Sequence, residues 1–165
     1  PLKILMTGAS SFTGMWFARE LARAGHSVIT PLLHARDNYK DTRLHRIEIL
    51  KDHTETIFEC PFGSPKFLDL IDSLDEFDLL CHHASEVTNY KSADFDAIKA
   101  LEKNTWNLPK ILKVLKDKKC NQMLLTGTVF EPSEGTGGTH SLAVSPYGLS
   151  KGLTSTYFEY YTTQF

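Results

Sequence analysis

The chain has 165 residues, of which 41% are hydrophobic and 23% charged, so it is long enough to bury a core as one soluble globular domain. Its formal net charge of −2 offers no basic surface for nucleic acid, and no apolar run approaches the length of a membrane span. Because the three cysteines are widely spaced and form no metal or redox motif, we expect a reducing, cytoplasmic location.

Short apolar runs predict strands, and amphipathic stretches between them predict helices. In chain order these are strand Lys3–Thr7, helix Phe12–Ala24, strand Ser27–Leu33, a short helix near 42–50, strand Thr56–Glu59, a helix from Ser64-Pro65 to Leu74, strand Asp78–His82, the helical stretch Ala93–Lys118, strand Gln122–Thr126, a loop over Glu131–Ser145 and a helix from Pro146. We expect Pro109 to kink or split the stretch that contains it. The alternation predicts an α/β fold, a doubly wound parallel Rossmann sheet with strand order 3-2-1-4-5.

The first strand, turn and helix carry a nucleotide-binding pattern. Gly8 can adopt backbone angles closed to other residues, and Gly14 has no side chain to hold the helix away from the sheet. The free amide groups at the helix start then face the turn, where an anionic pyrophosphate fits. The pattern is typical of a dinucleotide-binding fingerprint, although Ser11 stands where the central glycine is expected. Taken alone, an ordinary strand–helix turn of another α/β protein is the alternative.

The last predicted helix begins with a candidate acid–base pair. Tyr147 and Lys151 are four residues apart, which places them on one face of the helix. Because a nearby ammonium favours the ionised phenol, we expect Lys151 to lower the pKa of Tyr147 and make it an acid–base group at neutral pH. This spacing is common, so a surface tyrosine beside a solvated lysine is the alternative.

The order of the motifs is more specific than any one of them. The glycine turn is followed by His82-His83-Ala84 after the fourth strand, by Thr126 to Phe130 after the fifth, and then by the Tyr147/Lys151 pair. In this order the chain resembles the extended short-chain dehydrogenase/reductase family, the NAD(P)-dependent epimerases and dehydratases that act largely on nucleotide sugars. The resemblance covers essentially all 165 residues. It implies that 1–165 is an NAD(P)-binding Rossmann domain and that the substrate-binding region lies outside this chain.

The resemblance also implies roles for single residues. Tyr147 matches the family's catalytic acid/base, Lys151 matches the lysine that holds the nicotinamide ribose, and Thr126 matches the residue that orients the reacting oxygen. Thr128 is the less favoured candidate for that last role, and Asn104 matches a structural or proton-relaying asparagine. The residues expected to contact the cofactor are Gly8, Ser10, Ser11, Phe12, Gly14, Arg36, His82, Ala84 and Lys151.

The expected cofactor is NAD or NADP. An NAD site usually has an acidic residue at the end of the second strand, but Leu32, Leu33 and His34 stand there. Arg36 is close enough in sequence to meet a 2′-phosphate, which favours NADP. The expected partners are a small-molecule substrate such as a nucleotide sugar and a second copy of the chain, paired through the helices near 93–118 and 146–162. Neither nucleic acid nor a membrane is expected.

The chain departs from the family pattern at three places. Ser11 replaces a glycine, Cys60-Pro61 replaces a Gly-Asp pair that contacts adenine, and Phe130-Glu131 replaces Tyr-Gly. Two interpretations therefore stay open. The first is an oxidoreductase-type epimerase, dehydratase or reductase, in which a hydride moves between the nicotinamide and the substrate while Tyr147 moves the proton. The second is a non-catalytic NAD(P)-binding regulatory module on the same fold.

Overall fold

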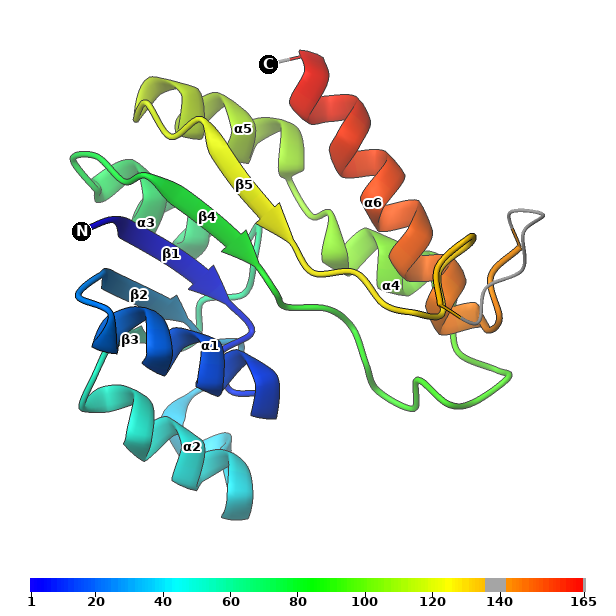
Figure 1. Ribbon diagram of the computed structural model, residues 1–165, viewed down its shortest axis with the longest axis horizontal. Helices are drawn as coiled ribbons and strands as arrows, with labels where there is room; N and C mark the ends of the chain where they lie inside the picture. The colour runs from blue at the N-terminus through cyan, green and yellow to red at the C-terminus, as the bar shows by residue number, and fades with distance from the viewer. Residues whose placement is uncertain (136–141, 165) are drawn as a thin grey trace.

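The computed structural model describes residues 1–135 and 142–164 (Figure 1). Five parallel strands form one sheet in the order β3-β2-β1-β4-β5. They are β1 (Lys3–Thr7), β2 (Ser27–Pro31), β3 (Glu55–Ile57), β4 (Leu79–His82) and β5 (Gln122–Leu125). The predicted doubly wound order is confirmed. Part of the loop expected over 131–145, and Phe165, lie outside the described residues.

Helices cover the sheet on both sides. They are α1 (Phe12–Arg23), α2 (Asp41–Lys51), α3 (Pro65–Ser73), α4 (Ala97–Asn104), α5 (Leu108–Asp117) and α6 (Pro146–Gln164), with a 3₁₀ turn η1 (Arg36–Asn38) before α2. Figure 1 shows α1 and α2 on one side of the sheet and α3 on the other, with α6 beside α4. Ser64 caps α3, as predicted, because its hydroxyl accepts from the amide of Phe67 at 3.1 Å.

Two apolar clusters hold these layers together. On one face, Leu5 and Leu80 pack with residues of α3, α5 and α6, including Phe158. On the other face, Ile4 and Met6 pack with residues of α1 and α2. Central strands of a parallel sheet are covered on both faces, which is why they are recognisable in the sequence as unbroken apolar runs.

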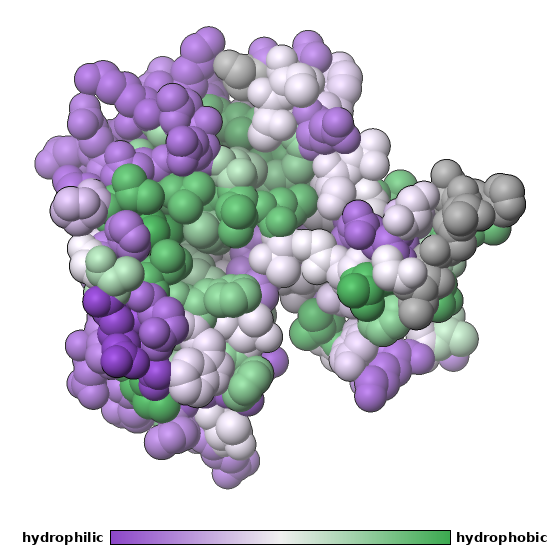
Figure 2. All heavy atoms as spheres, viewed as in Figure 1, coloured by the Kyte–Doolittle hydropathy of each residue, from purple (hydrophilic) through white to green (hydrophobic). Residues whose placement is uncertain are grey.

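One part of the sheet face on the α1 side is open to solvent. Figure 2 shows apolar side chains gathered there, and Leu124 of β5, which pairs with Cys81 of β4, is 57% exposed. α1 buries Gly14, Met15 and Ala18, whereas Phe17 of the same helix is 49% exposed.

The helical stretch expected over 93–118 is two shorter helices. The break comes before the proline, at Asn107, whose φ of 54° lies in the left-handed region. Pro109 lies in the first turn of α5, where a missing amide costs no helical hydrogen bond. The segment 84–96 before α4 is a long loop that leaves the sheet (Figure 1). Among the helices of the described residues, none is long and apolar enough to cross a membrane.

Candidate active site

The turn between β1 and α1 packs without room for side chains at its two glycines. Gly8 has a φ of +77°, and a Cβ built on it would lie 2.6 Å from the amide nitrogen of Ala84. A Cβ on Gly14 would lie 2.1 Å from the carbonyl oxygen of Gly8. The first turn of α1 contains no acidic residue, so the partial positive charge of the helix start stays available to an anion. The turn therefore fits the pyrophosphate of a dinucleotide.

Ser11 fits this turn because its side chain faces inward. Its Oγ accepts from the amide of Gly14 at 3.0 Å and donates to the carbonyl of Gly8 at 3.0 Å, so it caps α1. Phe12 is 63% exposed at the helix start, and the carbonyl of Ser10 accepts from Arg46 Nη1 at 3.4 Å. The arginine comes from α2 and stands beside the turn only because α2 packs on α1. No local sequence pattern predicts this contact.

The two histidines at the end of β4 point in opposite directions. His82 is 1% exposed, and its ring stacks on that of Phe62 at 3.8 Å between centroids. Its Nδ1 lies 2.8 Å from Thr7 Oγ1 and its Nε2 lies 3.0 Å from the carbonyl oxygen of Asn104. The structure therefore places His82 in the core and not in the crevice where it was expected to meet the cofactor. Ala84 does lie against the glycine turn, as expected.

Asn104 connects three parts of the site. Its Oδ1 accepts from the amide of Glu86 at 2.8 Å and its Nδ2 donates to Thr154 Oγ1 at 3.2 Å. Together with the bond between its carbonyl and His82, these contacts hold the loop after β4 to α6. Of the two roles considered for this residue, the geometry favours the structural one.

His83 is a site residue that was not among those expected from the sequence. Its Nδ1 lies 2.9 Å from Thr126 Oγ1 and its Nε2 lies 3.2 Å from Ser11 Oγ. Its ring packs against the ring of Phe17 in a T-shaped arrangement, with centroids 5.7 Å apart. His83 thus bridges the glycine turn and the end of β5. A signal was present in the sequence, since a residue next to the inward-facing His82 must face the other side of the strand.

The structure brings Lys151 and Thr126 into contact. The Nζ of Lys151 donates to the carbonyl oxygen of Thr126 at 2.6 Å, and the lysine is 4% exposed. Tyr147, one turn earlier on α6, lies half-buried between the rings of Tyr90 and Phe95, with centroids 5.3 Å and 5.8 Å away. All three predicted catalytic residues therefore belong to the region where the start of α6 meets the end of β5.

The expected effect of Lys151 on Tyr147 is not found. Burial raises the pKa of the Tyr147 phenol, and the Glu131 carboxylate raises it further, while the Ser85 hydroxyl opposes both. The ammonium of Lys151 is directed at a backbone carbonyl, and burial lowers its own pKa against the opposing effect of Glu131. The expectation was wrong because helical spacing says nothing about desolvation or about other partners. The phenol is protonated at neutral pH and can donate a proton.

Glu131 brings a buried carboxylate into this site. It is 9% exposed, and its Oε1 accepts from the amide of Thr128 at 3.0 Å. The carboxylate lies over Gly127, where a Cβ would come within 3.2 Å of Oε1. The departure from the family pattern at Phe130-Glu131 thus changes the charge beside Tyr147 as well as the local sequence.

Arg36 is engaged elsewhere. Its Nη2 lies 2.7 Å from Glu48 Oε1, and both side chains are about half exposed. A 2′-phosphate would have to replace this carboxylate, so the pair gives no support to a preference for NADP.

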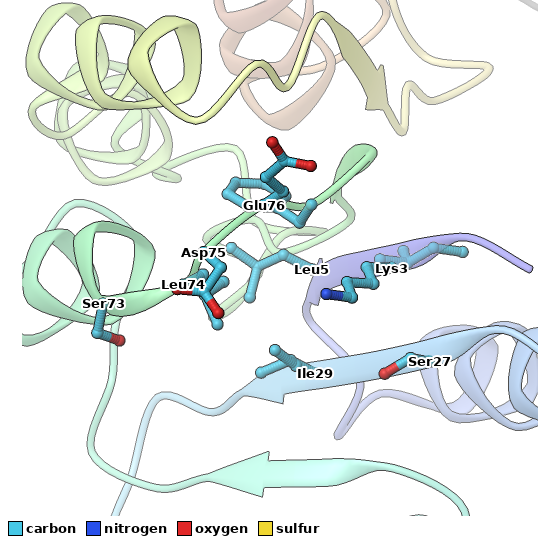
Figure 3. A pocket seen from close by; sticks show the side chains of 10 residues that line it. Lys3, Leu5, Ser27, Ile29, Ser73, Leu74, Asp75 and Glu76 are labelled. Carbon is cyan, nitrogen blue, oxygen red and sulfur yellow. The ribbon is translucent and has the colours of Figure 1, made fainter.

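Figure 2 shows the surface hollowed between the body that carries α1 and the lobe that carries the segment 84–96, on the side where the strands end. A separate cavity of about 250 Å³ lies at the opposite edge of the sheet (Figure 3). It is lined by the starts of β1 and β2 and by the segment between α3 and β4, including Lys3, Ser27 and Glu76. Because the strand ends and the glycine turn are at the other edge, this cavity is not part of the candidate site.

Comparisons with known proteins identify a family and a shared fold. A family model described as the NAD dependent epimerase/dehydratase family matches residues 4–165. A mutant UDP-glucuronic acid 4-epimerase from Bacillus cereus, in complex with a fluorinated UDP-sugar and NAD, is 20% identical with a TM-score of 0.73, over 99% of this chain and 52% of that one. A UDP-glucose 4-epimerase from Thermotoga maritima, with UDP-glucose, is 19% identical with a TM-score of 0.73, over 99% and 52% of the two chains.

A UDP-glucose 4-epimerase from Thermus thermophilus, in complex with NAD, is 18% identical with a TM-score of 0.72, over 99% of this chain and 51% of that one. No curated protein matches the chain significantly. At these identities the likeness establishes the shared fold. The chain spans about half the length of the solved structures that it matches.

Proposed function

The chain belongs to the NAD dependent epimerase/dehydratase family, and from this premise we propose that it is the cofactor-binding part of an NAD(P)-dependent epimerase, dehydratase or reductase for a nucleotide sugar. The observation that carries the proposal is a convergence at one edge of the sheet. The glycine turn packs against Ala84, and His83 and Lys151 both form hydrogen bonds with Thr126. The solved neighbours support the substrate class, since they are UDP-sugar epimerases in complex with UDP-sugars or NAD.

The proposed cofactor site uses two parts of the chain. The amide groups at the start of α1 and the turn at Gly8 would hold the pyrophosphate, and Lys151 would hold the nicotinamide ribose. The cofactor would accept and return a hydride, which is chemistry that side chains do not supply. Either NAD or NADP remains the proposed cofactor. The preference for NADP has no support, because Arg36 pairs with Glu48 and solved neighbours are complexes with NAD.

Tyr147 is the proposed proton donor. A phenol of ordinary pKa is already protonated at neutral pH, and burial and the nearby Glu131 raise the pKa of Tyr147 further. A protonated phenol can give its proton to a carbonyl oxygen as that carbonyl is reduced. The raised pKa also keeps the phenolate, which is the form that could accept a proton in the opposite direction, scarce at neutral pH.

Two further proposals concern the whole protein. We place the substrate-binding region outside these 165 residues, since the chain spans about half the length of its solved neighbours. A homodimer through the helices of 93–118 and 146–162 has exposed apolar side chains to bury, among them Ile98 and Tyr160, which are 62% and 60% exposed. Light scattering that finds a strict monomer for the full-length protein would contradict the dimer.

The decisive experiment compares Tyr147→Phe with a matched control in the full-length protein. Turnover of a UDP-sugar should fall about a hundredfold to ten-thousandfold, with cofactor affinity nearly unchanged. Tyr160→Phe, on the exposed side of the same helix, should turn over at the wild-type rate. A Tyr147→Phe variant as fast as the wild type would refute the assignment.

The second candidate is a non-catalytic NAD(P)-binding module. The buried Glu131 carboxylate beside a tyrosine of raised pKa favours it, because this charge opposes ionisation of the phenol. A full-length protein that binds NAD but turns over no nucleotide sugar would establish this second function.

A further inference from the structure

The hydrogen bonds around His83 determine which of its nitrogens carries the proton. A hydroxyl has one proton to donate, and Ser11 Oγ gives it to the carbonyl of Gly8 at 3.0 Å. Ser11 can therefore only accept from His83 Nε2, which lies 3.2 Å away. A neutral imidazole protonated at Nε2 has an unprotonated Nδ1, so this nitrogen accepts the proton of Thr126 Oγ1 at 2.9 Å.

The surroundings of His83 keep it neutral. Burial lowers its pKa, and the Lys151 ammonium on α6 lowers it further. Its neighbour on β4 is the buried His82, whose pKa is also lowered, to about 3. On the α1 side it meets the Ser11 hydroxyl and the ring of Phe17. At neutral pH the ring is thus an unoccupied proton acceptor, already bonded to the residue proposed to orient the reacting oxygen.

We propose that His83 and Thr126 form a proton relay that takes the proton from the substrate hydroxyl during oxidation at this site. The inference rests on the proposed function, because it requires Thr126 to lie beside that hydroxyl. The substrate O–H gives its proton to Thr126 Oγ1 while the Thr126 proton passes to His83 Nδ1, which produces an imidazolium. The oxidant is the nicotinamide dinucleotide of the proposed function, which takes the hydride from the same carbon and leaves a carbonyl.

This relay complements Tyr147. The protonated phenol can give a proton, and the neutral His83 can accept one. Between turnovers the imidazolium releases its proton to water and the tyrosinate takes one from water, so both groups return to their starting forms. Lys151 supports the geometry because its ammonium holds the backbone carbonyl of Thr126 at 2.6 Å. His83 acts on the substrate through Thr126, so it is a positioning residue as well as the final acceptor.

The hydrogen bonds can be tested without substrate or cofactor. In full-length protein labelled with ¹⁵N-histidine, NMR should show His83 at neutral pH as the Nε2–H tautomer, with its signals assigned by their loss in His83→Gln. Thr126→Val should shift the Nδ1 resonance, because it removes the hydroxyl that donates to this nitrogen. Thr128→Val, the control on the same segment, should leave it unchanged. An Nδ1–H tautomer, or an Nδ1 signal indifferent to Thr126→Val, overturns the relay.

The proton transfer itself is tested by the pH dependence of kcat for oxidation of a UDP-sugar. Wild-type kcat should fall on the acid side as His83 becomes protonated. His83→Gln should lose about a hundredfold in kcat, lose this acid limb, and keep its KM for NAD within about twofold. The control His53→Gln, in the exposed turn after α2, should keep the wild-type profile.

These experiments distinguish a failure of the relay from a failure of the proposed function. A His83→Gln enzyme that keeps the wild-type rate and acid limb, while Tyr147→Phe abolishes turnover, overturns the relay and leaves the proposed function standing. A wild-type protein that neither binds NAD nor turns over any UDP-sugar overturns the proposed function and the relay with it.

Discussion

Acidification should destabilise this protein through His82 before it affects most carboxylates. The ring is 1% exposed, and its Nε2 must donate to the carbonyl of Asn104, which can only accept. Nδ1 is therefore the acceptor for the Thr7 hydroxyl at 2.8 Å. The rings of Phe62 and Phe158 stack on the imidazole, with centroids 3.8 Å and 5.3 Å away. A second proton would place a charge in the core and would remove the acceptor that Nδ1 offers to the Thr7 hydroxyl.

The size of the effect follows from the two pKa values. Burial lowers the pKa of His82 from 6.5 to about 3 in the folded protein. Because the folded pKa is the lower one, the unfolded chain binds the proton first. Stability is therefore highest above the unfolded value and falls as the pH drops from 6.5 towards 3. At about 1.4 kcal/mol per pH unit, the loss between about pH 7 and about pH 5 is about 2 kcal/mol. This is a large share of a typical stability of about 5–15 kcal/mol.

Urea unfolding of the wild type and of His82→Gln at about pH 7, 6 and 5 measures this loss. His83, whose pKa is lowered as well, contributes in the same direction in both proteins and cancels from the comparison. The wild type should lose about 2 kcal/mol more than the variant over this range. His53→Gln, which replaces an exposed histidine, should retain the wild-type dependence on pH. Equal slopes for the wild type and His82→Gln would refute the reasoning.

Three other predictions address the remaining parts of the site. Gly14→Ala should abolish NAD binding and lower the free energy of unfolding by about 1–3 kcal/mol, because its Cβ would lie 2.1 Å from the carbonyl oxygen of Gly8. Calorimetric titration with NAD and thermal unfolding measure the two effects, and unchanged NAD binding would contradict the prediction. Glu131→Gln should lower the pKa of Tyr147, since the Glu131 carboxylate raises it. Ultraviolet titration of the phenols at alkaline pH should show one tyrosine with a shifted pKa. A titration curve identical to that of the wild type would contradict the effect of Glu131 on Tyr147. Arg36→Ala should change the affinities for NAD and NADP by less than about twofold, because an exposed ion pair occupies the guanidinium. A selective loss of NADP affinity would restore the NADP preference.

Much of the fold was predictable because its signals are local. The glycine turn, the Ser64 cap and the apolar strands each depend on a few neighbouring residues, and the structure has all three. The split of the helical stretch near Pro109 was predicted, but the break itself lies just before the proline, at the left-handed Asn107, because proline is acceptable in the first turn of α5.

The sequence alone determined the order of elements, the parallel sheet and the family, because strand and helix periods and the spacing of glycines are written in consecutive residues. Only the tertiary structure decided what the side chains of the site do. The bond from His83 to Thr126 joins residues 43 positions apart, and the contact of Lys151 with Thr126 joins residues 25 positions apart. The pKa of Tyr147 depends on burial and on Glu131, and that of His82 depends on burial. Desolvation and charge act through space, so spacing along the chain could place an acid–base pair but could not assign its protons.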